Sequence, residues 1–168
     1  MIDFQQTELR VVHVNVRSEI VGDDEHLAMD LRIEMDLPNV CLDKLDADLR
    51  PSLFRANDNG DLLGKDAQHM PHLRFPQLGP LSWDGSVSPV ALMLHLGTKK
   101  NELKLADAKF NKLRITPHEG GTCGLVWRLQ VHPTEEEAAK VMTVLKHTIK
   151  GTLDTSEATD DSEDDDDE

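Results

Sequence analysis

The chain has 168 residues, a formal net charge of −14, 38% hydrophobic residues and two cysteines. Two cysteines without a C-x-x-C pair exclude a disulfide framework and indicate reduced thiols in a cytosolic protein. No apolar run reaches the roughly 18 residues of a membrane span, and the first residues lack the basic and apolar regions of a signal peptide, so we expect a cytoplasmic protein that does not enter a membrane.

Residues 8–37 alternate apolar and polar side chains. Even positions are apolar from 12 to 16 and odd positions from 27 to 37, and the turn composition Gly22-Asp23-Asp24-Glu25 lies between them. A period of two predicts an antiparallel hairpin with one face in water. Centring the turn between Asp23 and Asp24 places Val16 opposite Leu31 and Val14 opposite Ile33.

The next segment predicts a short helix near 41–49, because Leu42, Leu45 and Leu49 recur at helical spacing. Pro51 would end this helix or restart it. Residues 55–89 contain four prolines and no sustained period, which indicates a long loop with one short strand around Leu73–Phe75. Residues 90–96 are apolar on both faces except at His95, as in a central strand.

Residues 102–116 predict one bent strand or two short ones, with a bulge between Phe110 and Leu113. The turn Glu119-Gly120-Gly121 leads into a second strand over 123–131. This connection would pair Ile115 with Leu125, and Leu113 with Trp127, which is expected in the core.

Thr134 and Glu137 form a capping box that predicts a helix after Pro133. Its buried stripe would consist of Ala138, Val141, Met142 and Leu145. Residues 148–153 suit either a continuation of this helix or an edge strand.

Residues 154–168 contain ten carboxylates and no Lys or Arg, so they account for ten of the fourteen net negative charges. A segment with so little apolar surface cannot offset the entropy cost of ordering, and we predict a disordered tail. The regulatory or partner-binding residues of this tail would be Asp160, Asp161, Glu163, Asp164, Asp165, Asp166, Asp167 and Glu168.

These elements predict a single β-rich domain over 1–153 followed by the tail at 154–168. The order of strands and helices lacks the alternation of a parallel sheet. The predicted class is α+β and sheet-dominated: an antiparallel sheet curled or closed as a small, OB-like barrel with one or two helices.

Residues 99–114 have a local excess of four positive charges. Basic side chains on paired strands are suited to following a phosphate backbone. A solvated sheet face is the alternative interpretation. The candidate nucleic-acid-binding residues are Lys99, Lys100, Lys104, Lys109, Lys112, Arg114 and Arg128, with Trp83 as the candidate exposed ring.

No Walker loop, G-x-G-x-x-G or G-x-S-x-G motif occurs in the chain. His69 and His72 form a close pair in a proline-rich loop, without a third patterned ligand, so we predict no metal site and no cofactor. Without a catalytic constellation, we expect a protein that is not an enzyme.

Three segments resemble pieces of uncharacterised small proteins of tailed phages: Asp48-Leu49-Arg50-Pro51-Ser52-Leu53-Phe54, Leu78-Gly79-Pro80-Leu81-Ser82-Trp83 and Glu119-Gly120-Gly121-Thr122. A small β-rich body with an acidic C-terminus is also similar in architecture to phage and bacterial single-stranded-DNA-binding proteins, whose OB-fold carries such a tail. In that family the tail competes with DNA and docks replication partners. This chain differs in ending on Asp167-Glu168 rather than on an aromatic or apolar residue, and in having few aromatics.

The leading hypothesis is a non-enzymatic, phage-type protein of DNA replication or recombination, located in the bacterial cytoplasm. It would bind single-stranded DNA and use its tail as a competitor or as a docking segment for a host or phage replication protein. The alternative is an acidic protein-interaction module that inhibits a host protein or mimics DNA. A third reading is an accessory protein whose tail serves solubility alone. The sequence is compatible with an oligomer.

Overall fold

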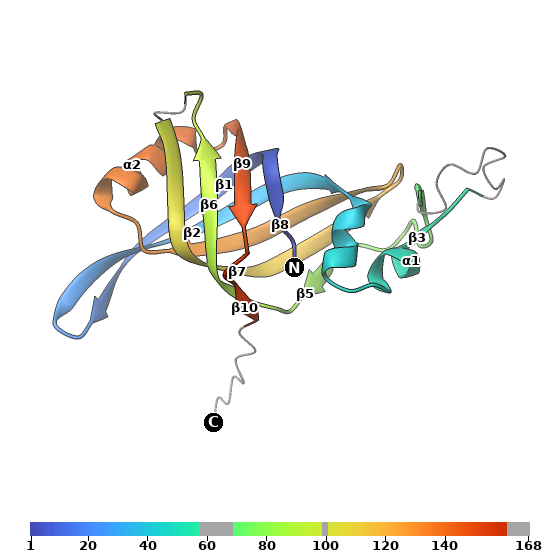
Figure 1. The fold of residues 1–168 in the computed structure, drawn as a ribbon, viewed down its shortest axis with the longest axis horizontal. Helices are drawn as coiled ribbons and strands as arrows, with labels where there is room; N and C mark the ends of the chain where they lie inside the picture. The colour runs from blue at the N-terminus through green and yellow to red at the C-terminus, as the bar shows by residue number, and fades with distance from the viewer. Residues whose placement is uncertain (58–68, 99–100, 161–168) are drawn as a thin grey trace.

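The computed structural model describes residues 1–57, 69–98 and 101–160. In this part of the chain six antiparallel strands close into a barrel in the order β1–β2–β8–β7–β6–β9, and β9 pairs back with β1 (Figure 1). The predicted α+β class with a small OB-like barrel is confirmed. The elements are β1 (Phe4–Val21), β2 (Asp24–Pro38), the 3-10 helix η1 (Asn39–Lys44), α1 (Leu49–Leu53), β3 (Phe54–Arg55), β4 (His72–Leu73), β5 (Leu81–Trp83), β6 (Val87–His95), β7 (Glu102–His118), β8 (Thr122–Val131), α2 (Glu135–Val144), β9 (Thr148–Asp154) and β10 (Thr159–Asp160).

β1 and β2 form the predicted hairpin, but the predicted register is wrong by two residues. Val14 lies opposite Leu31 and not opposite Ile33. The turn consists of Gly22 and Asp23, one residue earlier than expected, because Gly22 adopts a φ of 67°. This left-handed conformation costs glycine little, so the tightest turn forms there.

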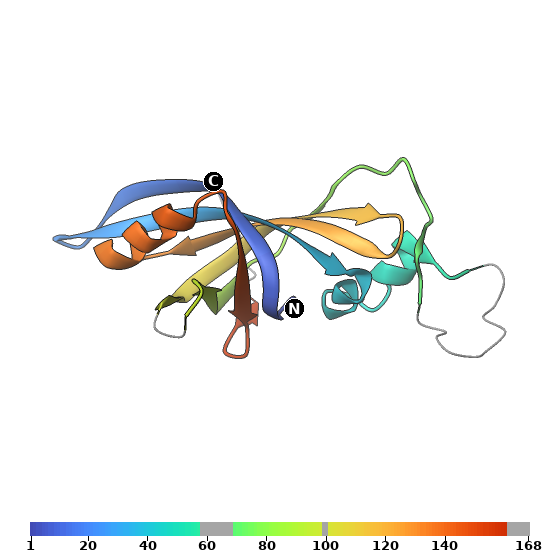
Figure 2. The same ribbon diagram turned by 90° about the horizontal axis from the view of Figure 1, so that it is seen from above.

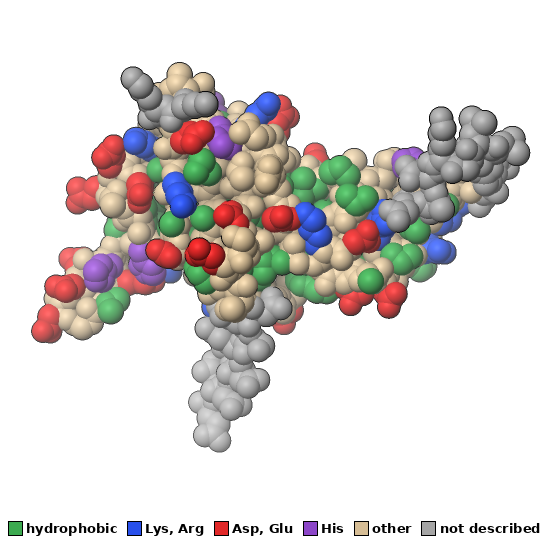
Figure 3. Space-filling view, viewed as in Figure 1, with side chains coloured by type: hydrophobic (Ala, Val, Ile, Leu, Met, Phe, Trp, Pro, Cys, Tyr) green, Lys and Arg blue, Asp and Glu red, His purple; other side chains and the backbone are tan. Residues whose placement is uncertain are grey.

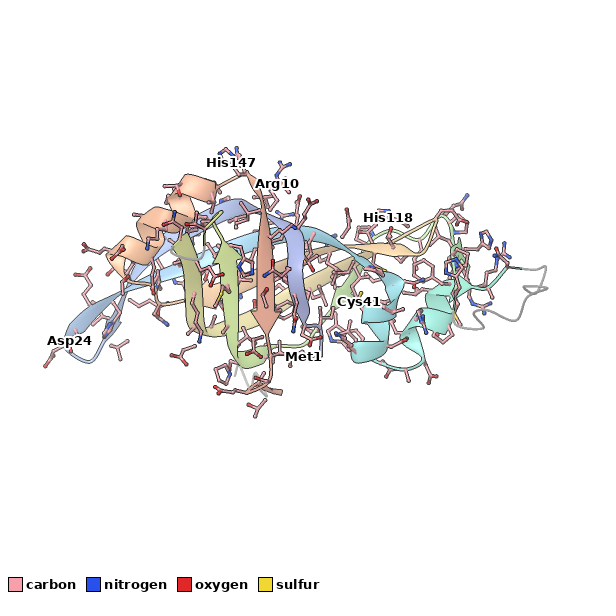
Figure 4. All side chains as sticks on the ribbon, turned by 45° about the horizontal axis from the view of Figure 1, so that its top comes forward. Met1, Arg10, Asp24, Cys41, His118 and His147 are labelled. Atoms are coloured by element: carbon pink, nitrogen blue, oxygen red, sulfur yellow. The ribbon has the colours of Figure 1, made fainter. Side chains whose placement is uncertain are left out.

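A bulge in β1 between Val11 and His13 changes which side chains face the barrel interior. Leu9, on the N-terminal side of the bulge, is buried, whereas Val16 on the other side is 47% exposed. The strand pair continues past the last residues that pair with β8 as a two-stranded arm, here defined as residues 17–28. Figure 2 shows the arm leaving the body, and Figure 4 marks Asp24 at its tip.

β7 and β8 are joined by the predicted turn at residues 119–121, and both of its glycines have positive φ. Ile115 lies opposite Leu125, as predicted. The two buried side chains keep the hydrophobic faces of β7 and β8 on the same side of the sheet.

β7 is one continuous strand whose register shifts between residues 111 and 114, which confirms the predicted bulge. Lys112 lies at this shift with a φ of 52°. Asn111 lies opposite Arg128 and Arg114 opposite Val126, so Trp127 faces the bulge itself, and its expected pairing with Leu113 stays a prediction. The extra residue at the bulge moves every later residue of β7 by one position relative to β8.

The segment after β2 differs from the predicted helix near 41–49. It forms η1 and then α1, and Pro51 lies in the first turn of α1, which agrees with the expectation that a helix restarts at Pro51. Proline is tolerated in the first turn because the first N–H groups of a helix have no partner within it. Within the predicted loop, β4 forms a short strand that overlaps the expected one at Leu73.

α2 begins with the predicted capping box. The Thr134 hydroxyl accepts a hydrogen bond from Glu137 N at 3.2 Å, and the Glu137 carboxylate accepts one from Thr134 N at 2.9 Å. Val141 is buried as expected, but Met142 is 50% exposed and does not belong to the buried stripe. Consecutive helical residues point in directions about 100° apart, and only the Val141 side of α2 faces the barrel.

Residues 148–154 form β9, which lies between β1 and β6 and is therefore not an edge strand. The described chain then continues past the predicted domain boundary. Thr159 and Asp160 form β10 against Ser88 and Val87, and Ala158 packs on the core. β6 begins four residues before its pairing with β9 at Ala91, which leaves an open edge that β10 takes up. Residues 161–168 lie outside the described chain.

The barrel interior is filled by aliphatic side chains around Trp127, which is 1% exposed and thus in the core as predicted. Its ring lies 4.8 Å from that of Phe110 and 6.2 Å from that of Phe4, measured between centroids. Tilted rings at these distances pack favourably beyond the area that they bury.

Replacing Ile33 with Asp tests the assignment of the barrel interior. Ile33 is fully buried opposite Trp127, so we expect this change to lower the free energy of unfolding by about 4 kcal/mol or more. Glu34→Lys, at the exposed next position, should change it by less than about 0.5 kcal/mol. Urea denaturation followed by tryptophan fluorescence measures both. Similar losses in the two variants would mean that the two faces of β2 are assigned incorrectly.

Candidate nucleic-acid interface

The predicted basic side chains separate into two groups in the structure. One group gathers where β7 pairs with β8 and consists of Lys109, Lys112, Arg114 and Arg128. Lys104 does not join it, because it lies near the other end of β7, opposite Met93 of β6. Lys99 and Lys100 lie outside the described residues.

Two further basic side chains, Arg32 and His13, extend this group across the sheet. His13 lies opposite Arg32, Arg32 opposite Arg128, and Arg128 opposite Asn111, so the four residues form one row over β1, β2, β8 and β7. Sequence reasoning missed Arg32 and His13. The alternation of β2 places Arg32 on the outer face, but only the pairing of β2 with β8 brings it beside Arg128.

Arg128 is held in position by two amide side chains. Its Nε donates to Asn111 Oδ1 at 2.8 Å, and Asn111 Nδ2 donates to Gln130 Oε1 at 2.9 Å. A guanidinium that is already oriented loses less conformational entropy when it binds an anion.

A depression of about 360 Å³ lies over this row, and we call it the cationic groove. Among the described residues that line it, Asp30 is the only carboxylate. Among the described residues, no carboxylate lies within ion-pair distance of Arg32, Lys112 or Arg114. The groove is lined by His13, Asn15, Asp30, Arg32, Lys112, Arg114, Val126, Trp127 and Arg128.

Arg17, a residue of the arm, forms an ion pair with Asp30. Arg17 Nη1 lies 2.6 Å from Asp30 Oδ2, and Arg17 also pairs with Glu19 at 2.8 Å. Burial acts to raise the pKa of Asp30, but hydrogen bonds from Arg17 and Gln130 and the charge of Arg128 outweigh it, so the pKa lies below its ordinary value. Asp30 is therefore ionised at neutral pH, and its charge is balanced mainly by Arg17.

A second, larger cavity of about 840 Å³ adjoins the cationic groove, with which it shares Lys112 and Arg128; we call it the wall cavity. It opens where β7 changes partner from β6 to β5, next to the bulge at Lys112. Lys109 and Trp83 also line it, together with Asp84 and Lys44. This arrangement places the predicted Trp83 beside the predicted cations.

Trp83 is less exposed than predicted. It is half-buried and packs against the core, with Leu113 opposite it on β7. The loop after β5 also holds the ring, because a Cβ on Gly85 would lie 3.3 Å from Trp83 Nε1. One edge of the ring therefore remains available to the wall cavity.

The predicted tail residues are only partly described. Asp160 belongs to β10, and Ala158, two residues before it, lines the wall cavity. Asp161 and Glu163–Glu168 lie outside the described residues.

The two histidines considered as a metal site have different surroundings in the structure. His72 Nδ1 lies 2.6 Å from Glu119 Oε1, and its Nε2 contacts Asn57 Oδ1 at 2.5 Å. His69 is exposed. No three His, Cys, Asp or Glu side chains in the described ranges lie close enough to hold a metal ion.

None of the helices in the described part of the chain has the length and apolar character needed to span a membrane.

Comparison with known proteins finds no match: no protein-family model, no curated protein and no solved structure is similar to this chain.

Replacing Asp30 with Asn should destabilise the protein at neutral pH and not at strongly acidic pH. A lowered pKa means that the ionised carboxylate stabilises the fold above the pKa of the unfolded chain, about 3.9, and that this stabilisation is lost as the pH falls through the folded pKa. Thermal unfolding of both proteins from pH 7 to pH 2.5 measures the difference. A gap in melting temperature that stays constant over this range would exclude an ionised Asp30 as its cause.

Proposed function

We propose that this protein binds single-stranded nucleic acid on the outer face of the β1–β2–β8–β7 sheet, without catalysing a reaction. The observation that carries the proposal is the cationic groove, in which Arg32, Lys112, Arg114 and Arg128 converge from three strands while Asp30, the acid that lines it, is engaged by Arg17.

Phosphate is the ligand that best suits these side chains. Arginine presents a planar fork of donors that matches phosphate oxygens, and three of the four cations are arginines. Cations without a neighbouring carboxylate keep their charge available for an external anion.

A single strand suits the site better than a duplex. Side chains arranged in rows on a sheet, next to an aromatic ring, form the usual platform on which a flexible strand lays its phosphates and stacks its bases. Trp83 in the wall cavity lies beside Lys112 and supplies such a ring. The architecture of a small OB-like barrel supports the same choice.

The acidic C-terminal segment is proposed to compete with nucleic acid for this face. The described chain ends at β10, beside the wall cavity, where Ala158 and Val87 are lining residues. The eight residues that follow carry seven carboxylates and could span up to roughly 27 Å from that point. A dense negative charge tethered beside Lys109, Lys112 and Arg128 would occupy the cations until phosphates displace it.

We further propose that the protein acts in DNA replication or recombination of a phage, in the bacterial cytoplasm. The support is the resemblance of its sequence segments to tailed-phage proteins and of its organisation to acidic-tailed single-stranded-DNA-binding proteins.

The arm supports the second candidate, an acidic module that binds a basic protein. Its exposed tip carries Asp23, Asp24 and Glu25. Ile20 and Val21 are 79% and 60% exposed beside these acids. Figure 3 shows the acidic and apolar side chains of the arm together, away from the barrel. An exposed apolar surface rimmed by acids is typical of a protein-binding site.

Reversing three charges of the cationic groove should abolish binding of an oligothymidine strand of about 30 nucleotides. In Arg32→Glu/Lys112→Glu/Arg114→Glu, the groove keeps its shape and becomes repulsive, so we expect a loss of at least 100-fold in affinity at low salt. In the wild-type protein the logarithm of the affinity should fall with the logarithm of salt concentration with a slope of about −3, for four phosphate contacts. Fluorescence anisotropy at several salt concentrations measures both.

The matched control is Lys104→Glu/Lys146→Glu/Lys150→Glu, which changes the net charge equally at exposed sites outside the groove. It should retain most of the affinity. Equal losses in the two triple variants would indicate nonspecific attraction and would contradict a defined site.

Removing residues 161–168 should tighten binding of the same strand. The truncation keeps β10, so the barrel is intact, and it removes the proposed competitor. The gain should be largest at low salt, because screening weakens the competition. Absence of binding by both forms at low salt would exclude the nucleic-acid function and favour the protein-interaction module.

A further inference from the structure

Two cysteines from distant parts of the chain meet in the core. Cys41 lies on η1 and Cys123 near the start of β8, and both are buried. Each thiol shifts the pKa of the other, as expected for two sulfur atoms that lie close together. Figure 4 marks Cys41 on η1.

The backbone keeps η1 and the start of β8 together. Asn39 N donates to Gly121 O at 2.9 Å, two residues before each cysteine. Leu37, one turn before Cys41, lies opposite Cys123 in the β2–β8 pair. The Asn39 side chain adds a hydrogen bond to Met70 O at 2.8 Å. The proximity of the thiols is thus a consequence of sheet register and of the path of the chain after β2.

We propose that Cys41 and Cys123 form a reversible disulfide when the protein meets a peroxide or a low-molecular-weight disulfide, and that this cross-link fastens η1 to the sheet. The inference is independent of nucleic-acid binding. It assigns a modification site to residues that the sequence alone indicates only as reduced packing thiols.

Cys41 is the thiol that reacts first. The hydrogen bond from Cys123 lowers the pKa of Cys41, against the effect of burial and with help from the charge of Lys44. The same hydrogen bond, burial and the proximity of the Cys41 charge raise the pKa of Cys123. Cys41 is also the more exposed of the two, at 5% against 0%. A thiol with the lower pKa holds more thiolate, which is the nucleophilic form.

With hydrogen peroxide the chemistry takes two steps. The Cys41 thiolate attacks one peroxide oxygen, the O–O bond breaks, and the departing hydroxide takes up a proton to leave as water, so Cys41 becomes a sulfenic acid. Cys123 sulfur then attacks the Cys41 sulfur and displaces the hydroxyl group as a second water, which receives the Cys123 proton. Two thiols are oxidised by two electrons, and one peroxide is reduced to two waters.

The test is to treat the full-length, folded protein with a small excess of hydrogen peroxide, quench it, and alkylate the remaining thiols in denaturant. We expect mass spectrometry to show the loss of two hydrogens, no alkylation, and a single peptide pair joining Cys41 to Cys123 that a reductant separates. The same oxidant in denaturant should give the cross-link at least tenfold more slowly, because the two residues are far apart in an unfolded chain.

The two single variants distinguish the roles of the thiols. Cys123→Ser should leave a sulfenic acid on Cys41 that a cyclic 1,3-diketone traps, and Cys41→Ser should leave Cys123 unmodified under the same conditions. The proposal is overturned if both thiols of the folded wild-type protein remain alkylatable after oxidation, if Cys41 proceeds to sulfinic acid without a cross-link, or if the disulfide joins two chains. These readouts use the wild-type protein, so they hold even if a variant fails to fold.

Discussion

The bulge at Lys112 is the constraint on which both the barrel and the cationic groove depend. β7 has to pair with β8 along its whole length while its other edge changes partner from β6 to β5. A regular strand cannot bend sharply enough to follow both partners, and one extra residue supplies the bend. Lys112 takes the left-handed conformation for this purpose, at a cost of about 1 kcal/mol or more for a residue other than glycine. The bend lies beside the wall cavity and the cationic groove, and Lys112 and Arg128 line both of them.

The local features of this fold were accessible from sequence because they depend on neighbouring residues. Alternation identified the strands, Thr134 and Glu137 identified the start of α2, and residues 119–121 identified a turn. The register of the first hairpin was not accessible in the same way. A turn at Asp23 and Asp24 and a turn at Gly22 and Asp23 have similar composition. The choice between them depends on Gly22 and on the bulge after Val11.

The residues of the candidate site likewise divide into those brought together by a local turn and those brought together by pairing of distant strands. Lys112, Arg114 and Arg128 belong to one hairpin, so their proximity could be predicted from the turn between β7 and β8. Arg32 comes from a strand about a hundred residues away, and only the β2–β8 pairing places it beside Arg128. Pairing between distant strands depends on barrel closure, which involves all six strands at once.

The barrel interior is filled by side chains, so the proposed binding site is on the outer wall. A barrel of six strands is too narrow to enclose a ligand when its inward side chains are large. Here Trp127 and Phe110 occupy the centre, and Gly151 is required in β9 because any side chain there would overlap Leu9. The polar residues of the outer wall are correspondingly free to vary in charge without disturbing the core. On one wall they collect cations, whereas the arm and the C-terminal residues carry acids, and the proposed site and its proposed competitor both rest on this separation of charge.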